Sequence, residues 1–154
     1  MENFEKRMYF FVPYQLTGIQ KGIQCGHAAL EYALKYKHDD IFNNFVQYHK
    51  TWIVLNGGTT NNSQKYIGTL NNILNVLVEN NIKHSTFFEP DLNDSLTSIC
   101  VIIDERVFNF KPINILTEDD DCYQEWEKNA LNFLQTKENL ILFKLINGKS
   151  LATN

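Results

Sequence analysis

The chain has 154 residues, a formal net charge of −4 at pH 7 and a sequence pI near 5.5. This length suits one domain, which we expect to span residues 1–154. The acidic balance argues against an extended nucleic-acid footprint, which normally needs a surplus of lysine and arginine, although it leaves room for a local basic pocket.

No apolar run approaches the roughly 20 residues that cross a membrane, and the run at residues 8–12 is too short for a signal peptide. The three cysteines, Cys25, Cys100 and Cys122, stand far apart and lack metal-ligand spacing. We therefore expect reduced thiols, a cytoplasmic protein with no membrane contact, and neither a metal nor another cofactor.

The first half of the chain predicts two strands separated by two helices. The apolar aromatic run 8–12 predicts a strand, and Thr17 and Gln20 have the spacing of a capping box at the start of a helix. Asp39 or Asp40 can cap a second helix. The unbroken apolar run within 51–55 favours a central strand that is buried on both faces. In the first helix we expect a buried apolar stripe formed by Ile19, Ile23, Gly26, Leu30 and Ala33.

The second half predicts a helix that ends at 80–81 and a hairpin of two strands, 83–88 and 98–103, joined by the turn-forming segment 89–94. A further helix begins near residue 121, and the apolar segment 140–146 fits no particular element. Together these elements predict an α/β fold, with a four-stranded mixed β-sheet covered by helices on both faces.

A polar stripe on the first helix gives the best candidate for a functional site. Gln20, Gln24, His27 and Glu31 recur at helical spacing, and Lys21 lies one turn before Gln24. The helix starts where the first strand ends, which is the edge where open α/β sheets bind ligands. An amphipathic helix also needs a polar face for solubility alone, and Gln20 can simply complete the cap.

Two segments resemble the type 2 peptidyl-tRNA hydrolases (Pth2). The segment 20–30 is similar to the family's N-terminal signature, in which glutamine is followed three residues later by histidine and alanine. The segment 88–98 looks like the E-P-D-L-x-x-x-L-T-A segment of bacterial members. The resemblance is strongest over residues 8–107, and it fades beyond them, so we expect the C-terminal helix and tail, 112–154, to be specific to this chain.

The resemblance implies a metal-free hydrolase that releases a peptide or N-blocked amino acid from the 3′ end of tRNA. It places Gln24 and His27 on the signature positions, and makes Asp91 and Thr97 the acidic and hydroxyl members of the site. His27, Asp91 and Thr97 would then act in catalysis, while Gln24 and Glu89 would bind substrate.

The family's lysine is displaced in this sequence. It usually lies four residues before the glutamine, a position that Gln20 occupies here, while Lys21 lies three residues before. An offset of one residue turns a helical side chain by about 100°. Lys21 is the remaining candidate for the catalytic cation and Gln20 for a substrate contact, and either Glu89 or Asp91 can take the role of the acid.

Two other interpretations stay open. A Pth2-like domain without the lysine can bind tRNA, a nucleotide or a protein without cleaving anything. The triplets His49-Lys-Thr51 and His84-Ser-Thr86 resemble the paired motifs of two-histidine phosphoesterases, although histidines at strand starts are commonplace. Gly57-Gly58 lacks the spacing of a phosphate-binding loop. The sequence does not decide between a monomer and a homodimer.

Overall fold

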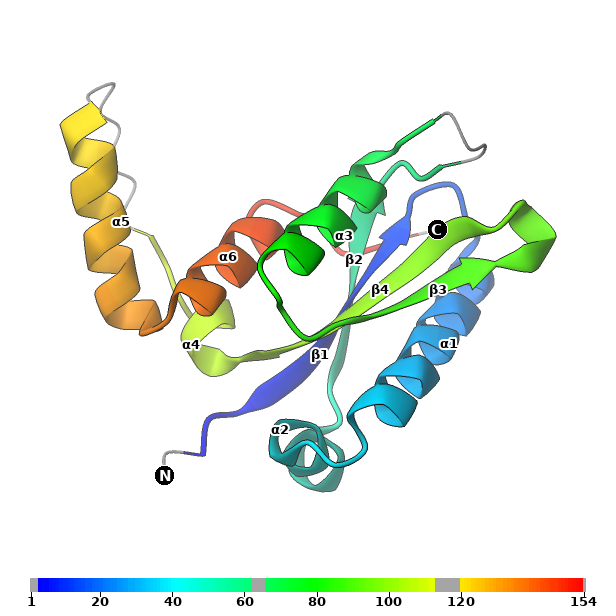
Figure 1. Cartoon of the computed structure of the whole chain (residues 1–154), viewed down its shortest axis with the longest axis horizontal. Helices are drawn as coiled ribbons and strands as arrows, with labels where there is room; N and C mark the ends of the chain where they lie inside the picture. Colours follow the sequence, from blue (N-terminus) through cyan, green and yellow to red (C-terminus); the bar gives the residue numbers. More distant parts are fainter. Residues whose placement is uncertain (1–2, 62–65, 113–119, 154) are drawn as a thin grey trace.

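A four-stranded mixed sheet lies at the centre of the fold (Figure 1). A computed structural model of the chain describes residues 3–61, 66–112 and 120–153. The strand order is β2-β1-β4-β3, with β1 parallel to β2 and β4 antiparallel to both of its neighbours. This arrangement confirms the predicted α/β class and mixed sheet. The strands are β1 (Lys6–Pro13), β2 (Trp52–Gly58), β3 (Ser85–Glu89) and β4 (Ser95–Asp104).

Helices connect and flank these strands, and two of them, the short α4 (Glu105–Phe108) and α6 (Lys137–Ile146), were not predicted. The segment that the sequence left unassigned forms a regular helix, α6, which packs beside α4 and α5. Figure 1 shows α5 standing away from the sheet at one end of the molecule. Within the described ranges, every helix falls short of the length and apolar character that a membrane crossing requires. The α-helices are α1 (Gly18–Tyr36), α2 (Asp40–Asn44), α3 (Thr69–Glu79), α4 (Glu105–Phe108), α5 (Asp120–Leu134) and α6 (Lys137–Ile146).

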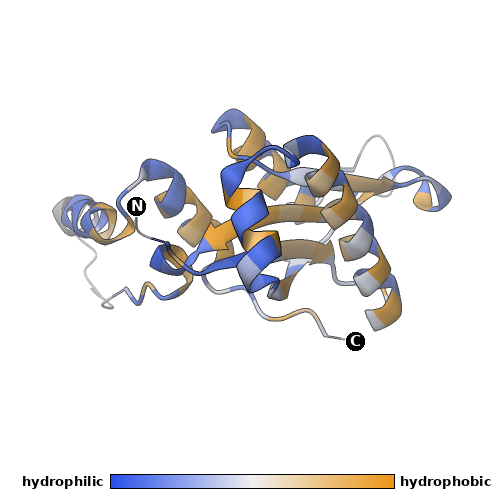
Figure 2. Ribbon diagram, turned by 90° about the horizontal axis from the view of Figure 1, so that it is seen from below, coloured by the Kyte–Doolittle hydropathy of each residue, from blue (hydrophilic) through white to orange (hydrophobic). Residues whose placement is uncertain are grey.

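Alternation along β1 divides the core into two apolar clusters. Met8, Phe10 and Val12 point to the face that α1 covers, whereas Tyr9 and Phe11 point to the opposite face. The cluster that contains Tyr9 and Phe11 also contains residues of α3 and α6, so helices pack against both faces of the sheet. In Figure 2 the central strands carry the hydrophobic colours, while the helices carry both hydrophobic and hydrophilic ones.

Two local structures that the sequence predicted are present: the capping box at the start of α1 and the hairpin turn between β3 and β4. The Thr17 hydroxyl accepts the backbone N–H of Gln20, and the Gln20 side chain accepts the N–H of Thr17, which completes the capping box of α1. The predicted hairpin is the antiparallel pair β3 and β4. Its turn contains a short 3-10 helix, η2 (Pro90–Leu92), and two residues with left-handed backbone, Asn93 and Asp94.

The predicted central position of the second strand is wrong, because β2 lies at the edge of the sheet. Trp52 at its start is 46% exposed. The outer edge of β2 is covered by the C-terminal tail: Asn56 donates its N–H to the Ser150 carbonyl, and Ala152 donates to the Val54 carbonyl, both at 2.9 Å. An unbroken apolar run is compatible with this position because its side chains alternate between the two core clusters: Ile53 and Leu55 pack in one, and Val54 packs against the other.

The predicted buried stripe of α1 is also wrong. Ile19, Ile23 and Leu30 are 79%, 52% and 72% exposed. The face that packs on the sheet is the opposite one, formed by Lys21, Gln24, Cys25, Ala28 and Tyr32. Both faces contain apolar residues at helical spacing, so periodicity alone could not decide which one turns inward.

Candidate functional site

Three side chains form a continuous hydrogen-bonded chain between α1 and the β3–β4 hairpin. The Thr97 hydroxyl donates to Gln24 Oε1 at 2.5 Å, and Gln24 Nε2 donates to Glu89 Oε2 at 2.8 Å. Thr97 and Gln24 are buried, while Glu89 lies at the rim. Both functional groups of the Gln24 amide therefore have a partner, which fixes the amide in one orientation.

The fold positions each member of this chain. Helix α1 packs across β3 and β4, which brings Gln24 over the hairpin. Thr97 stands on β4, and Glu89 is the last residue of β3, just after an irregularity between Phe87 and Phe88. Glu89 also caps η2, because its Oε1 accepts the backbone N–H of Asp91 at 3.3 Å.

The Glu89 carboxylate is held in its ionised form. The Gln24 amide, then the Asp91 N–H and then the neighbouring His27 lower the pKa of Glu89 below its ordinary value of 4.5. Each of these groups favours the negative charge. At neutral pH the rim of the site therefore carries a fixed anion that can accept a proton or orient a water.

A cavity of about 350 Å³ opens beside Thr97, at the carboxyl end of β1. Thr97, Gln20 and Asn93 contribute polar groups to its lining, together with apolar groups of Leu16 and Leu92. Its volume lies in the range of small-molecule pockets. The cavity thus lies where the sequence placed ligand binding, between the start of α1 and the turn after β3.

His27 lies next to Glu89 but faces an aromatic ring. It stacks on Phe87, with ring centroids 4.3 Å apart and an interplanar angle of 18°. The stack fixes the plane of the imidazole at the boundary between the polar chain and an apolar groove on the other side of α1. Phe87 was not identified from the sequence, because nothing marked it apart from the other apolar residues of its strand.

The Lys21 side chain takes no part in the Thr97–Gln24–Glu89 hydrogen-bonded chain. Its side chain is buried on the sheet-facing side of α1, and its ammonium donates to the Thr153 carbonyl of the C-terminal tail. Gln24 and Lys21 are three positions apart, so they differ by about 60° around the helix. The structure does not bring Lys21 to Glu89 or Asp91.

Asp91 is exposed on η2, with its backbone N–H bonded to Glu89. The structure therefore brings together Gln24, Thr97 and Glu89, places His27 and Asp91 beside Glu89, and leaves Gln20 at the cavity and in the helix cap. The roles given to these residues stay predictions, as does the absence of a metal or cofactor.

Cys25, the neighbour of Gln24, does not supply a nucleophile. It is buried beneath α1, and burial raises the pKa of its thiol to about 12. Burial also raises the pKa of Cys100, which packs in the same cluster. At neutral pH both remain thiols, which react far more slowly than thiolates.

The two-histidine interpretation loses its geometric basis. His49 precedes β2 and His84 precedes β3, and these strands form opposite edges of the sheet. Three strand spacings separate them, about 14 Å. The triplets cannot converge on one phosphate.

Comparison of the sequence with known protein families found no matching family model, and comparison with curated proteins found no match either.

Proposed function

We propose that the chain is a carboxylic ester hydrolase with a Pth2-like fold, which releases a peptide or an N-blocked amino acid from the 3′ end of tRNA in the cytoplasm. The proposal rests on the Thr97–Gln24–Glu89 chain beside His27. These residues lie on two segments that resemble Pth2, and they are remote in sequence but adjacent in the fold. Peptidyl-tRNA is accordingly the proposed partner.

The proposed chemistry uses Glu89 as the base. Its carboxylate orients a water and takes one proton while the water oxygen bonds to the ester carbonyl carbon. The tetrahedral intermediate then breaks its bond to the ribose 3′ oxygen, which receives the proton, and the carboxylic acid and tRNA leave. The cavity beside Thr97 holds the ester, and Gln24 keeps Glu89 ionised and aimed.

The second candidate is a domain that binds tRNA, a nucleotide or a protein without cleavage. One observation favours it: the Lys21 ammonium is bound to the Thr153 carbonyl rather than presented to the cavity. The position that carries the family's lysine holds Gln20, which has no charge and completes the helix cap. Among the residues that the structure describes, no lysine or arginine lines the cavity to stabilise an oxyanion.

The test is release of the blocked amino acid from N-acetyl-aminoacyl-tRNA. We expect cleavage by the parent chain, and faster cleavage by Gln20→Lys, since one oxyanion donor is worth about 10²–10³ in rate. Lys21→Met, which keeps the buried stem but removes the ammonium, should change the rate little. If neither the parent nor Gln20→Lys cleaves while both bind the tRNA, the binding domain replaces the hydrolase.

The pH profile provides a separate check on Glu89. A carboxylate with a lowered pKa stays ionised as the pH falls past 4.5, so its activity is lost only below that value. Gln24→Leu removes the main cause of the shift and should move the acidic limb of kcat/KM upward. An acidic limb that stays in place in Gln24→Leu would show that Glu89 is not the titrating base.

A further inference from the structure

We propose that the outer face of α1 is a dimer interface, which pairs antiparallel with the same face of a second copy of the chain. We call this face the α1 seam and define it by Ile19, Ile23, Gly26, Leu30 and Leu34. All four large side chains are more than half exposed, with Leu34 at 69%. The seam lies directly opposite the buried face of the helix, and the proposal is independent of the hydrolase activity.

The seam has the pattern of a helix that packs against another helix. Its spacing alternates between four and three residues from Ile19 to Leu30, which is the a/d repeat of a helix–helix contact. Monomeric proteins scatter single apolar residues over their surface, but they rarely expose a continuous apolar stripe. Along α1 the stripe extends over most of a helix that is about 28 Å long.

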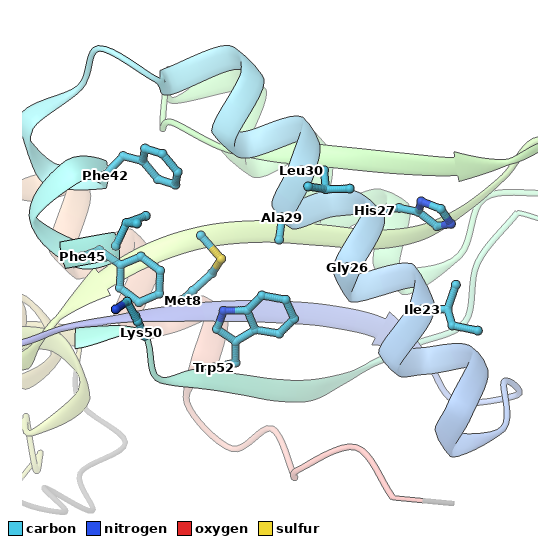
Figure 3. A pocket seen from close by; sticks show the side chains of 11 residues that line it. Met8, Ile23, Gly26, His27, Ala29, Leu30, Phe42, Phe45, Lys50 and Trp52 are labelled. Atoms are coloured by element: carbon cyan, nitrogen blue, oxygen red, sulfur yellow. The ribbon is translucent and has the colours of Figure 1, made fainter. Parts of the chain in front are cut away.

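The seam is continuous with an apolar groove on the sheet. Ile23, Gly26 and Leu30 form one wall of a groove of about 590 Å³ whose floor is Met8 and Trp52. Figure 3 shows Phe42 and Phe45 across this groove from α1, the helix that carries His27. A partner helix that lies along the seam can insert side chains into the groove, which enlarges the contact beyond that of one helix. A small apolar ligand would fill the groove but leave Ile19 and Leu34 in water.

The order of residues in the seam indicates that the partner is a second copy. Ile19 and Leu34, and likewise Ile23 and Leu30, lie equally far in sequence on either side of the midpoint between Gly26 and His27. A two-fold interface requires such self-complementarity. If residue i of the first copy contacts residue j of the second, then residue j of the first copy must also contact residue i of the second. In an antiparallel pair, isoleucine would meet leucine at every large position.

The centre and the flanks of the seam suit this arrangement. A Cβ added to Gly26 meets nothing within 4 Å, so another backbone can approach closely at the proposed axis. Glu31 and Lys35, the charged residues beside the second half of the seam, would lie level with Gly22 and Gly18 of the other copy. Like charges therefore do not meet across the axis.

The test uses a complementary pair of charges. The parent should be a dimer in sedimentation-equilibrium measurements, and Ile23→Glu or Leu30→Lys alone should raise the dissociation constant about 30-fold or more, as the loss of a central contact does. An equimolar mixture of the two variants should dimerise again, because the introduced carboxylate of one copy would face the introduced ammonium of the other. Val78→Glu, an exposed apolar position on α3 at the opposite face of the sheet, is the matched control and should leave the dimer intact.

A monomeric parent would overturn the proposal, as would a dimer that persists in both single variants. A mixture that stays monomeric while each variant is folded would show that the seam serves a different arrangement or another protein, and would overturn the antiparallel pair. Circular dichroism and urea unfolding of each variant separate loss of association from loss of folding.

Discussion

Replacing Glu89 by glutamine is expected to lower the rate of blocked aminoacyl-tRNA hydrolysis by about 10²–10⁴-fold, the usual contribution of a general base. Glutamine keeps the size of the side chain and an oxygen that can still accept the Gln24 amide hydrogen. The hydrogen-bonded chain to Thr97 is thus preserved while the negative charge is removed. The measurement is single-turnover release of the blocked amino acid by the parent and by the variant.

Asp91→Asn is the matched control for this experiment. Asp91 lies two residues from Glu89, and its backbone N–H bonds to Glu89, a contact that asparagine retains. Its side chain is exposed on η2, so its loss should lower the rate much less than the loss of Glu89. A larger effect at Asp91 would reverse the two roles and make Glu89 the residue that orients the turn.

Replacing Phe11 by alanine is expected to lower the free energy of unfolding by about 3–5 kcal/mol, as other buried Phe-to-Ala changes do. Phe11 is fully buried at the centre of the sheet, and its cluster contains Leu70, Leu77 and Ile99. A domain of this size is stable by only about 5–15 kcal/mol, so a large share of its stability would be lost. Urea unfolding monitored by circular dichroism measures the change.

Phe88→Ala removes the same atoms from an exposed position on the edge strand β3 and should cost about 1 kcal/mol or less. Equal losses at the two positions would mean that β3 is buried in solution by something other than this chain.

The elements that sequence analysis predicted well are those fixed by local chemistry. The capping box at Thr17 and Gln20, the turn-forming segment 89–94 and the apolar run of β1 each involve only neighbouring residues. Their physical causes are hydrogen bonds and backbone preferences that act over a few positions.

The features that the sequence missed depend on contacts between distant residues. The edge position of β2 follows from the order in which distant strands pair, and the inward face of α1 follows from its packing on β3 and β4. Glu89 meets Gln24 only because the register of the β3–β4 hairpin places the end of β3 beneath α1. The spacing on α1 could predict that Gln24 and His27 share a side of the helix, but not that Glu89 rather than Asp91 would meet them.

The bond between Lys21 and Thr153 has a consequence for the order of folding during synthesis. Its two residues are 132 positions apart, and the same tail supplies the outer partner of β2. Contacts of such long range form late, since a large loop must close before they contribute any stability. A nascent chain that has completed α1 and β2 therefore keeps a hydrated ammonium and an unpaired strand edge until residues 150–153 have been made. We expect this interval to be when the growing chain is most exposed to association with other strands.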